Sequence, residues 1–144
     1  MTLDALETSL SAHAITAGAG SFKFEYLYES NHDRTSGIYP KFIVPPVSFP
    51  LNTTSISGGK SEVQTELKLY ILDDWIKDYD NDTITRTKKW DAINALGKLF
   101  FQALDGDLVI TLIDTIVDPP ELLDQGQNVD GVIGLMYTFN IKAC

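Results

Sequence analysis

The sequence predicts an α+β protein: a single, mostly antiparallel sheet with two helices packed on one face. Apolar residues recur every three or four positions in two segments and alternate with polar residues in several others. The predicted strands form groups separate from the helices, which is typical of α+β rather than doubly wound proteins. The chain has 144 residues and no internal repeat, so we expect one domain over residues 1–144.

The first helix is expected over residues 2–16 and is defined by one apolar stripe: Leu3, Leu6, Leu10 and Ala14. Thr2 is a suitable N-cap, and Gly18 and Gly20 are expected to end the helix.

Three or four strands are expected before the second helix, because residues 47–51 resume an extended path after the proline pair. Residues 21–29 alternate aromatic and other side chains, with Phe22, Phe24, Tyr26 and Tyr28 on one face. Residues 38–44 form the next strand, which Pro45-Pro46 ends because proline has no N–H for the ladder. Residues 61–73 give the clearest pattern, with Leu67, Leu69 and Ile71 on one face and Glu66 and Lys68 on the other.

The second helix is expected from Asp82 or Thr83 to Leu104, with Gly106 as a left-handed cap. Its apolar stripe contains Trp90, Ile93, Leu96, Leu99, Phe100 and Leu104. Residues 108–117 are apolar on both faces, which predicts a central strand. A polar loop at 118–130 and a last strand at 131–143 follow.

The charge balance argues against sequence-specific DNA binding. The chain carries 20 acidic and 11 basic residues, a net charge of −9, whereas affinity for nucleic acid comes from lysine and arginine. An acidic surface would suit the wall of a DNA conduit. The alternative is that the negative charge only keeps the protein soluble.

Cysteine usage and hydropathy favour a cytosolic protein. Cys144 is the only cysteine, so no intrachain disulfide can form. The first residues, Met1-Thr2-Leu3-Asp4, lack the basic start of a signal peptide, and no apolar run is long enough to span a membrane. The sequons at Asn52 and Asn81 are therefore not expected to be used.

Two motifs resemble ligand sites without completing them. Gly58-Gly59-Lys60-Ser61 ends like a phosphate-binding loop, but Thr54 replaces the first glycine and a strand is expected to follow instead of a helix. Asp78, Asp80 and Asp82 start like a calcium loop, but Thr83 and Lys89 replace its glycine and glutamate.

No enzyme site emerges from the remaining polar residues. His13 and His32 are the only histidines, too few for a three-histidine zinc site, and no nucleophile-elbow pattern frames a serine. An aromatic base-stacking platform on the first strand conflicts with the acidic balance. We therefore predict no catalytic, cofactor-binding or metal-binding residues, no cofactor, and a protein that is not an enzyme.

Long connectors are the positive functional signal. The connectors 30–38, 52–60 and 118–130 exceed the usual median of about 4–6 residues. Long ordered loops are often binding elements, and the proline pairs Pro45-Pro46 and Pro119-Pro120 would stiffen two of the approaches. This pattern favours an assembly protein.

The order of elements resembles the tail-terminator and tail-completion family of tailed bacteriophages, whose members join head and tail at the neck. The resemblance rests on the first helix, the strand start Tyr39-Pro40-Lys41-Phe42-Ile43-Val44, the alternating strand from Glu62 to Leu72, the second helix and the closing strand Gly134 to Ile141. It covers nearly the whole chain at the level of element order.

The resemblance implies a structural virion protein that forms a homomeric ring, usually of six subunits. The ring would end the tail tube or join it to the head connector, and DNA would pass through its lumen without specific recognition. Localisation would be the virion tail or neck, after assembly in the host cytoplasm. Two alternatives stay open: a monomeric adaptor or assembly factor, and an enzyme with a sparse site in a deep pocket.

Overall fold

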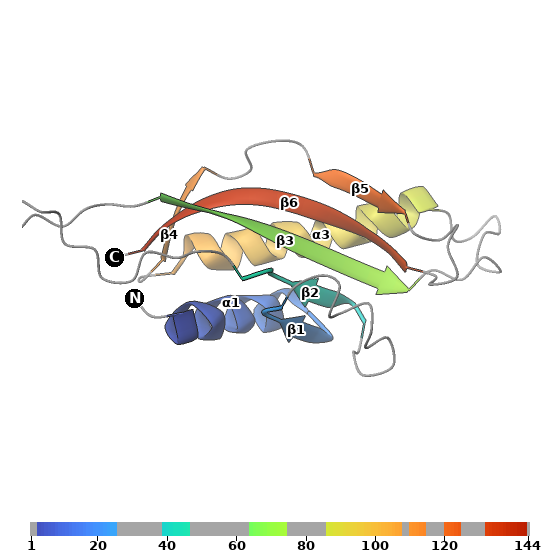
Figure 1. Cartoon of the computed structure of the whole chain (residues 1–144). Helices are drawn as coiled ribbons and strands as arrows, with labels where there is room; N and C mark the ends of the chain where they lie inside the picture. Colours follow the sequence, from blue (N-terminus) through green and yellow to red (C-terminus); the bar gives the residue numbers. More distant parts are fainter. Residues whose placement is uncertain are drawn as a thin grey trace, which may run out of the picture.

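The computed structural model describes residues 3–25, 39–46, 64–74, 86–107, 110–114, 120–124 and 132–143. Within these residues, two helices and six strands follow one another (Figure 1). They are α1 (Leu3–Ala17), β1 (Ser21–Lys23), β2 (Lys41–Ile43), β3 (Gln64–Asp74), α3 (Arg86–Asp105), β4 (Ile110–Asp114), β5 (Glu121–Asp124) and β6 (Val132–Ala143). The predicted α+β class is confirmed.

The six strands form one sheet in the order β1-β2-β3-β6-β4, and β5 also pairs with β6. Only the β1–β2 pair is parallel, so the sheet is mostly antiparallel, as predicted. β3 and β6 pair without a break from Gln64↔Lys142 to Asp74↔Val132 and form a long twisted ribbon across the molecule (Figure 1).

The end of α1 follows from Gly18, which has a φ of 102°. The Gly18 N–H donates to the carbonyl of Ile15 and the Ala19 N–H donates to that of Ala14, at 3.0 and 2.9 Å. This pair of bonds is the Schellman motif, which satisfies carbonyls that the helix leaves open. The chain then enters β1, and the predicted glycine stop is confirmed.

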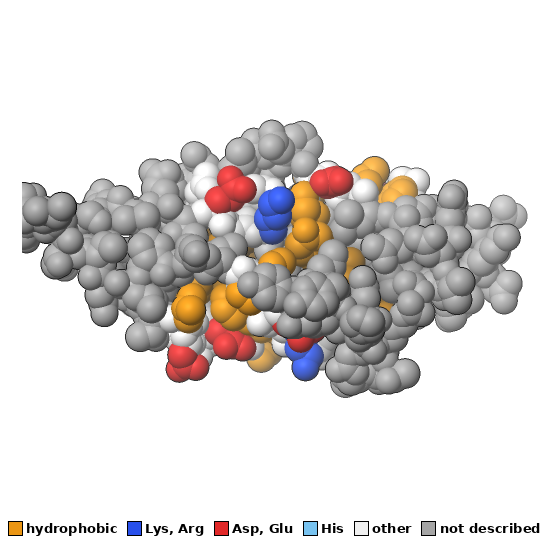
Figure 2. Space-filling view, in the orientation of Figure 1, with side chains coloured by type: hydrophobic (Ala, Val, Ile, Leu, Met, Phe, Trp, Pro, Cys, Tyr) orange, Lys and Arg blue, Asp and Glu red, His pale blue; other side chains and the backbone are white. Residues whose placement is uncertain are grey.

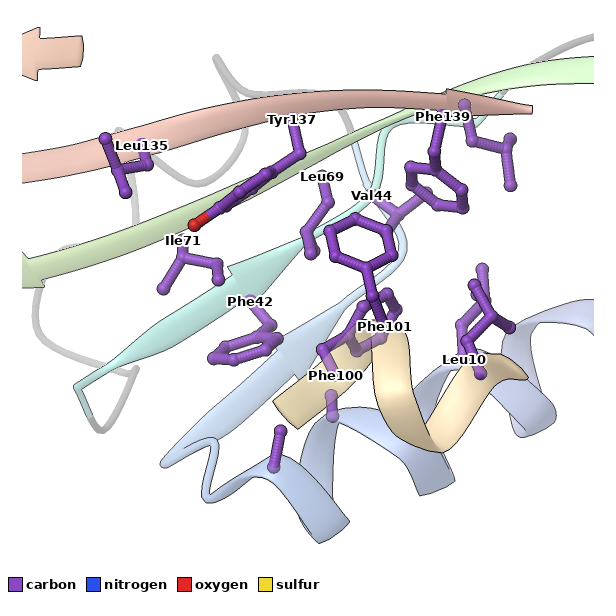
Figure 3. Close-up of a cluster of buried hydrophobic side chains, with 14 of the residues drawn as sticks. Leu10, Phe42, Val44, Leu69, Ile71, Phe100, Phe101, Leu135, Tyr137 and Phe139 are labelled. Carbon is purple, nitrogen blue, oxygen red and sulfur yellow. The ribbon is translucent and has the colours of Figure 1, made fainter. Parts of the chain in front are cut away.

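Both helices pack on one face of the sheet, as predicted, and the core lies between the two layers (Figure 3). From the sheet come Phe42, Val44, Leu67, Leu69, Ile71, Ile133, Leu135, Tyr137, Phe139 and Ile141. From the helices come Leu6, Leu10, Ala14, Ala17, Ile93, Phe100, Phe101 and Leu104. The strand members are alternate residues, as a half-buried pleated strand requires.

Aromatic rings fill the middle of this core (Figure 3). Phe101 lies edge-on to Phe139 and Tyr137, with ring centroids 5.2 and 5.4 Å apart, and Phe100 lies 5.9 Å from Phe42. Edge-to-face aromatic pairs add about 0.5–1.5 kcal/mol each beyond the burial of their surface. The cluster therefore ties α3 to β2 and β6.

The prediction of a central strand at residues 108–117 was wrong. β4 covers only Ile110–Asp114 and stands at the end of the strand order, while β3 and β6 occupy the middle. A central strand must be long enough to pair along both sides. β6 does so with β3 on one side and with β4 and β5 on the other.

The prediction of a loop over 118–130 was also wrong in part, because it contains β5. Glu121–Asp124 pairs with β6 through the register Glu121↔Met136 to Asp124↔Ile133. Four residues with a charge at each end show no clear alternation, so the strand depends on backbone pairing with β6. The connectors 30–38 and 52–60 lie outside the described residues.

Three smaller predictions on element ends and faces need correction. β1 stops at Lys23 rather than continuing through Phe24. Leu99 is 49% exposed instead of buried. Phe101, which the predicted stripe leaves out, is in the core. Gly106 does not adopt a left-handed conformation; α3 ends in a turn in which the Asp107 N–H donates to the carbonyl of Leu104.

Candidate functional site

A tyrosine from β6 meets a glycine in the middle of α3. The Tyr137 hydroxyl donates to Asn94 Oδ1 at 2.8 Å, and a methyl group on Gly97 would collide with the Tyr137 ring and hydroxyl. Glycine costs a helix interior about 1 kcal/mol relative to alanine. Gly97 therefore reflects the close approach of the tyrosine rather than a helix end.

Burial raises the pKa of Tyr137 to about 12. Removing the hydroxyl from water disfavours the phenolate, and the side chain is only 1% exposed. A phenol with this pKa is a poor general base near neutral pH. The Tyr137–Asn94 pair therefore fixes α3 on β6 rather than forming a reactive centre.

Two further contacts fix the start of α3 on the sheet. The Trp90 Nε1–H donates to the carbonyl of Gly134 at 3.1 Å, and Lys89 Nζ lies 3.1 Å from Asp73 Oδ2. A side chain at Gly134 would collide with the carbonyl of Ile71 and with Leu72 in β3. Gly134 therefore permits close approach of the two long strands, a common role of glycine inside a strand.

At the other end of α3, a histidine joins the two helices. His13 Nε2 of α1 lies 2.6 Å from Asp107 Oδ2, just beyond the end of α3. Both side chains are mostly buried, so the contact excludes water at the junction between the helices. His13, which the sequence places on α1, is a structural partner of Asp107.

A buried lysine lies on the face of the sheet away from the helices. Lys41 of β2 is only 4% exposed, and its Nζ lies 5.1 Å from the centroid of the Tyr39 ring. A cation over an aromatic face is favourable, by about 2 kcal/mol when it is desolvated. Tyr39 and Lys41 thus hold each other at the start of β2.

Apart from the Lys41–Tyr39 contact within one segment, these polar contacts join separate elements of the fold. Together they do not form a set of nucleophile, base and oxyanion donor. Within the described ranges, no three His, Cys, Asp or Glu side chains come together in a way that could hold a metal ion. Phe22 and Phe24 pack partly buried against the core.

The other sequence candidates lie outside the described residues. These are Gly58 to Ser61, the acidic residues Asp78, Asp80 and Asp82, His32, Asn52, Asn81, Tyr26, Tyr28 and Cys144.

The sequence reasoning missed Asn94, Gly97, Phe101 and Gly134. A signal was present for the glycines, because each interrupts a segment whose pattern otherwise fits a helix or strand. Which residue each glycine accommodates depends on the pairing of distant elements and is not visible in the sequence.

The outer surface of the helices exposes large apolar side chains. Ile15 of α1 is 68% exposed and Leu99 of α3 is 49% exposed. The exposed residues near them include Ala12, Ala92 and Ala95, together with Lys98 and Gln102. Single exposed apolar residues are normal. Ile15 lies in a stretch without Asp, Glu, Lys or Arg at residues 8–17, whereas Leu99 directly follows Lys98.

The opposite face of the sheet is partly open. The register places Glu66, Lys68 and Tyr70 of β3 beside Asn140, Thr138 and Met136 of β6, all at least partly exposed. Figure 2 shows this face, with hydrophobic side chains next to a basic one near the middle of the two strands. At the β2 end of the same face, Ile43 and Leu72 are buried and Tyr70 packs against them.

Comparison with known proteins does not assign a family. A scan against protein-family models finds no match, and a search of curated proteins finds no matching sequence. In the parts of the chain that the structure describes, neither helix is long and apolar enough to cross a bilayer.

Proposed function

We propose that this protein is a structural subunit of a homomeric ring at the neck or tail of a tailed-phage virion. The ring, with six copies as the expected number, would end the tail tube or join it to the head connector. It would assemble in the host cytoplasm and remain in the virion. The partners would be further copies of the chain, tube proteins and connector proteins.

The observation that carries the proposal is the order of elements. The resemblance implies a first helix, a strand starting at Tyr39-Pro40, a long alternating strand, a second helix and a long closing strand. α1, β2, β3, α3 and β6 follow one another in that order. β5, which breaks the 118–130 segment, is an addition to the simplest form of that order.

Two further features agree with a structural role. The Tyr137–Asn94 and His13–Asp107 contacts join separate elements of the fold. The net charge of −9 would also keep DNA from adhering to a lumen, because phosphate backbones bind basic surfaces.

The test is the native mass of the purified protein over a wide concentration range, with negative-stain images of the largest species. The monomer weighs 16.0 kDa, so six copies would weigh about 96 kDa. Closed rings with an open centre are the expected result. A protein that stays monomeric at every concentration would favour the alternative of a monomeric adaptor that needs a different partner.

A further inference from the structure

We draw no further inference here: the strongest candidate, the partly open face of the sheet around Tyr70 of β3 and Met136 of β6, carries nothing, because nothing in the described part of the structure shows what covers it.

Discussion

On the side of the sheet that faces the helices, Leu67, Leu69 and Ile71 of β3 are fully buried, whereas Glu66 and Lys68 in the same strand are exposed. β6 shows the same division: Tyr137 and Phe139 are buried, and Met136, Thr138 and Asn140 are half-buried. The two faces belong to the same paired strands but lie in different surroundings.

This difference separates what holds the fold together from what is available for contacts. The helix-facing side excludes water and contains the aromatic cluster of Phe100, Phe101, Tyr137 and Phe139. Changes there should alter the free energy of unfolding. Changes on the open side should leave the free energy of unfolding nearly constant.

The largest effect is expected for Phe100→Ala. Phe100 is fully buried between both helices and the sheet, and loss of a buried phenylalanine costs about 3–5 kcal/mol through lost burial and the cavity left behind. Met136→Ala on the open face should cost less than about 1 kcal/mol. Chemical denaturation of both variants makes the comparison, and equal losses would contradict the division between the faces.

Gly97→Ala should destabilise the protein by about 2 kcal/mol, because the new methyl group meets the Tyr137 ring and overpacking costs about 1–3 kcal/mol. Helix propensity alone predicts the opposite sign, a gain of about 1 kcal/mol. The control is Ala95→Gly at an exposed position of the same helix, which should cost about 1 kcal/mol. A stabilised Gly97→Ala variant would show that Tyr137 does not approach the helix closely.

Raising the pH above 10 should weaken the fold through Tyr137. The unfolded tyrosine loses its proton near pH 10, but the folded one does so only near pH 12. Between these values the unfolded state binds fewer protons, so stability falls as pH rises, by about 1 kcal/mol at pH 11. Below pH 10 the stabilisation is fully present.

The measurement is denaturation at pH 8 and pH 11 for the unchanged protein and for Tyr137→Phe. Phenylalanine cannot ionise, so this variant should lose less stability between the two pH values. An identical loss in both proteins would mean that Tyr137 is not shielded from water.

The smallest effect is expected for the contact between His13 and Asp107. The pair is close but at the edge of the core, and a typical intramolecular hydrogen bond contributes about 0.5–1.5 kcal/mol. A double-mutant cycle of His13→Ala and Asp107→Ala isolates this coupling from the other interactions of Asp107. Additive losses would show that the two residues do not cooperate.

Periodicity was sufficient to predict the helices and the long strands. α1, α3, β3 and β6 each contain ten or more residues, and over that length the difference between periods of 3.6 and two is clear. The buried set Leu67, Leu69 and Ile71 follows directly from alternation. The stop of α1 at Gly18 follows from local chemistry, since glycine adopts a positive φ without strain.

Features that depend on pairing between distant elements were not predictable. β5 exists because β6 offers it a backbone edge, and β4 lies at the end of the sheet because β3 pairs with β6. Leu99 fits an apolar stripe by its spacing, but the helix rotates Phe101 toward Tyr137 and Phe139 instead. The roles of Asn94 and Gly97 could not be predicted for the same reason, because they depend on the position of Tyr137.

Chemical denaturation of Met136→Glu beside Phe100→Ala and the unchanged protein tests the separation of the two faces most directly. The account predicts a loss of less than about 1 kcal/mol in the free energy of unfolding, against about 3–5 kcal/mol for Phe100→Ala. A Met136→Glu variant that unfolds as readily as Phe100→Ala would contradict the account.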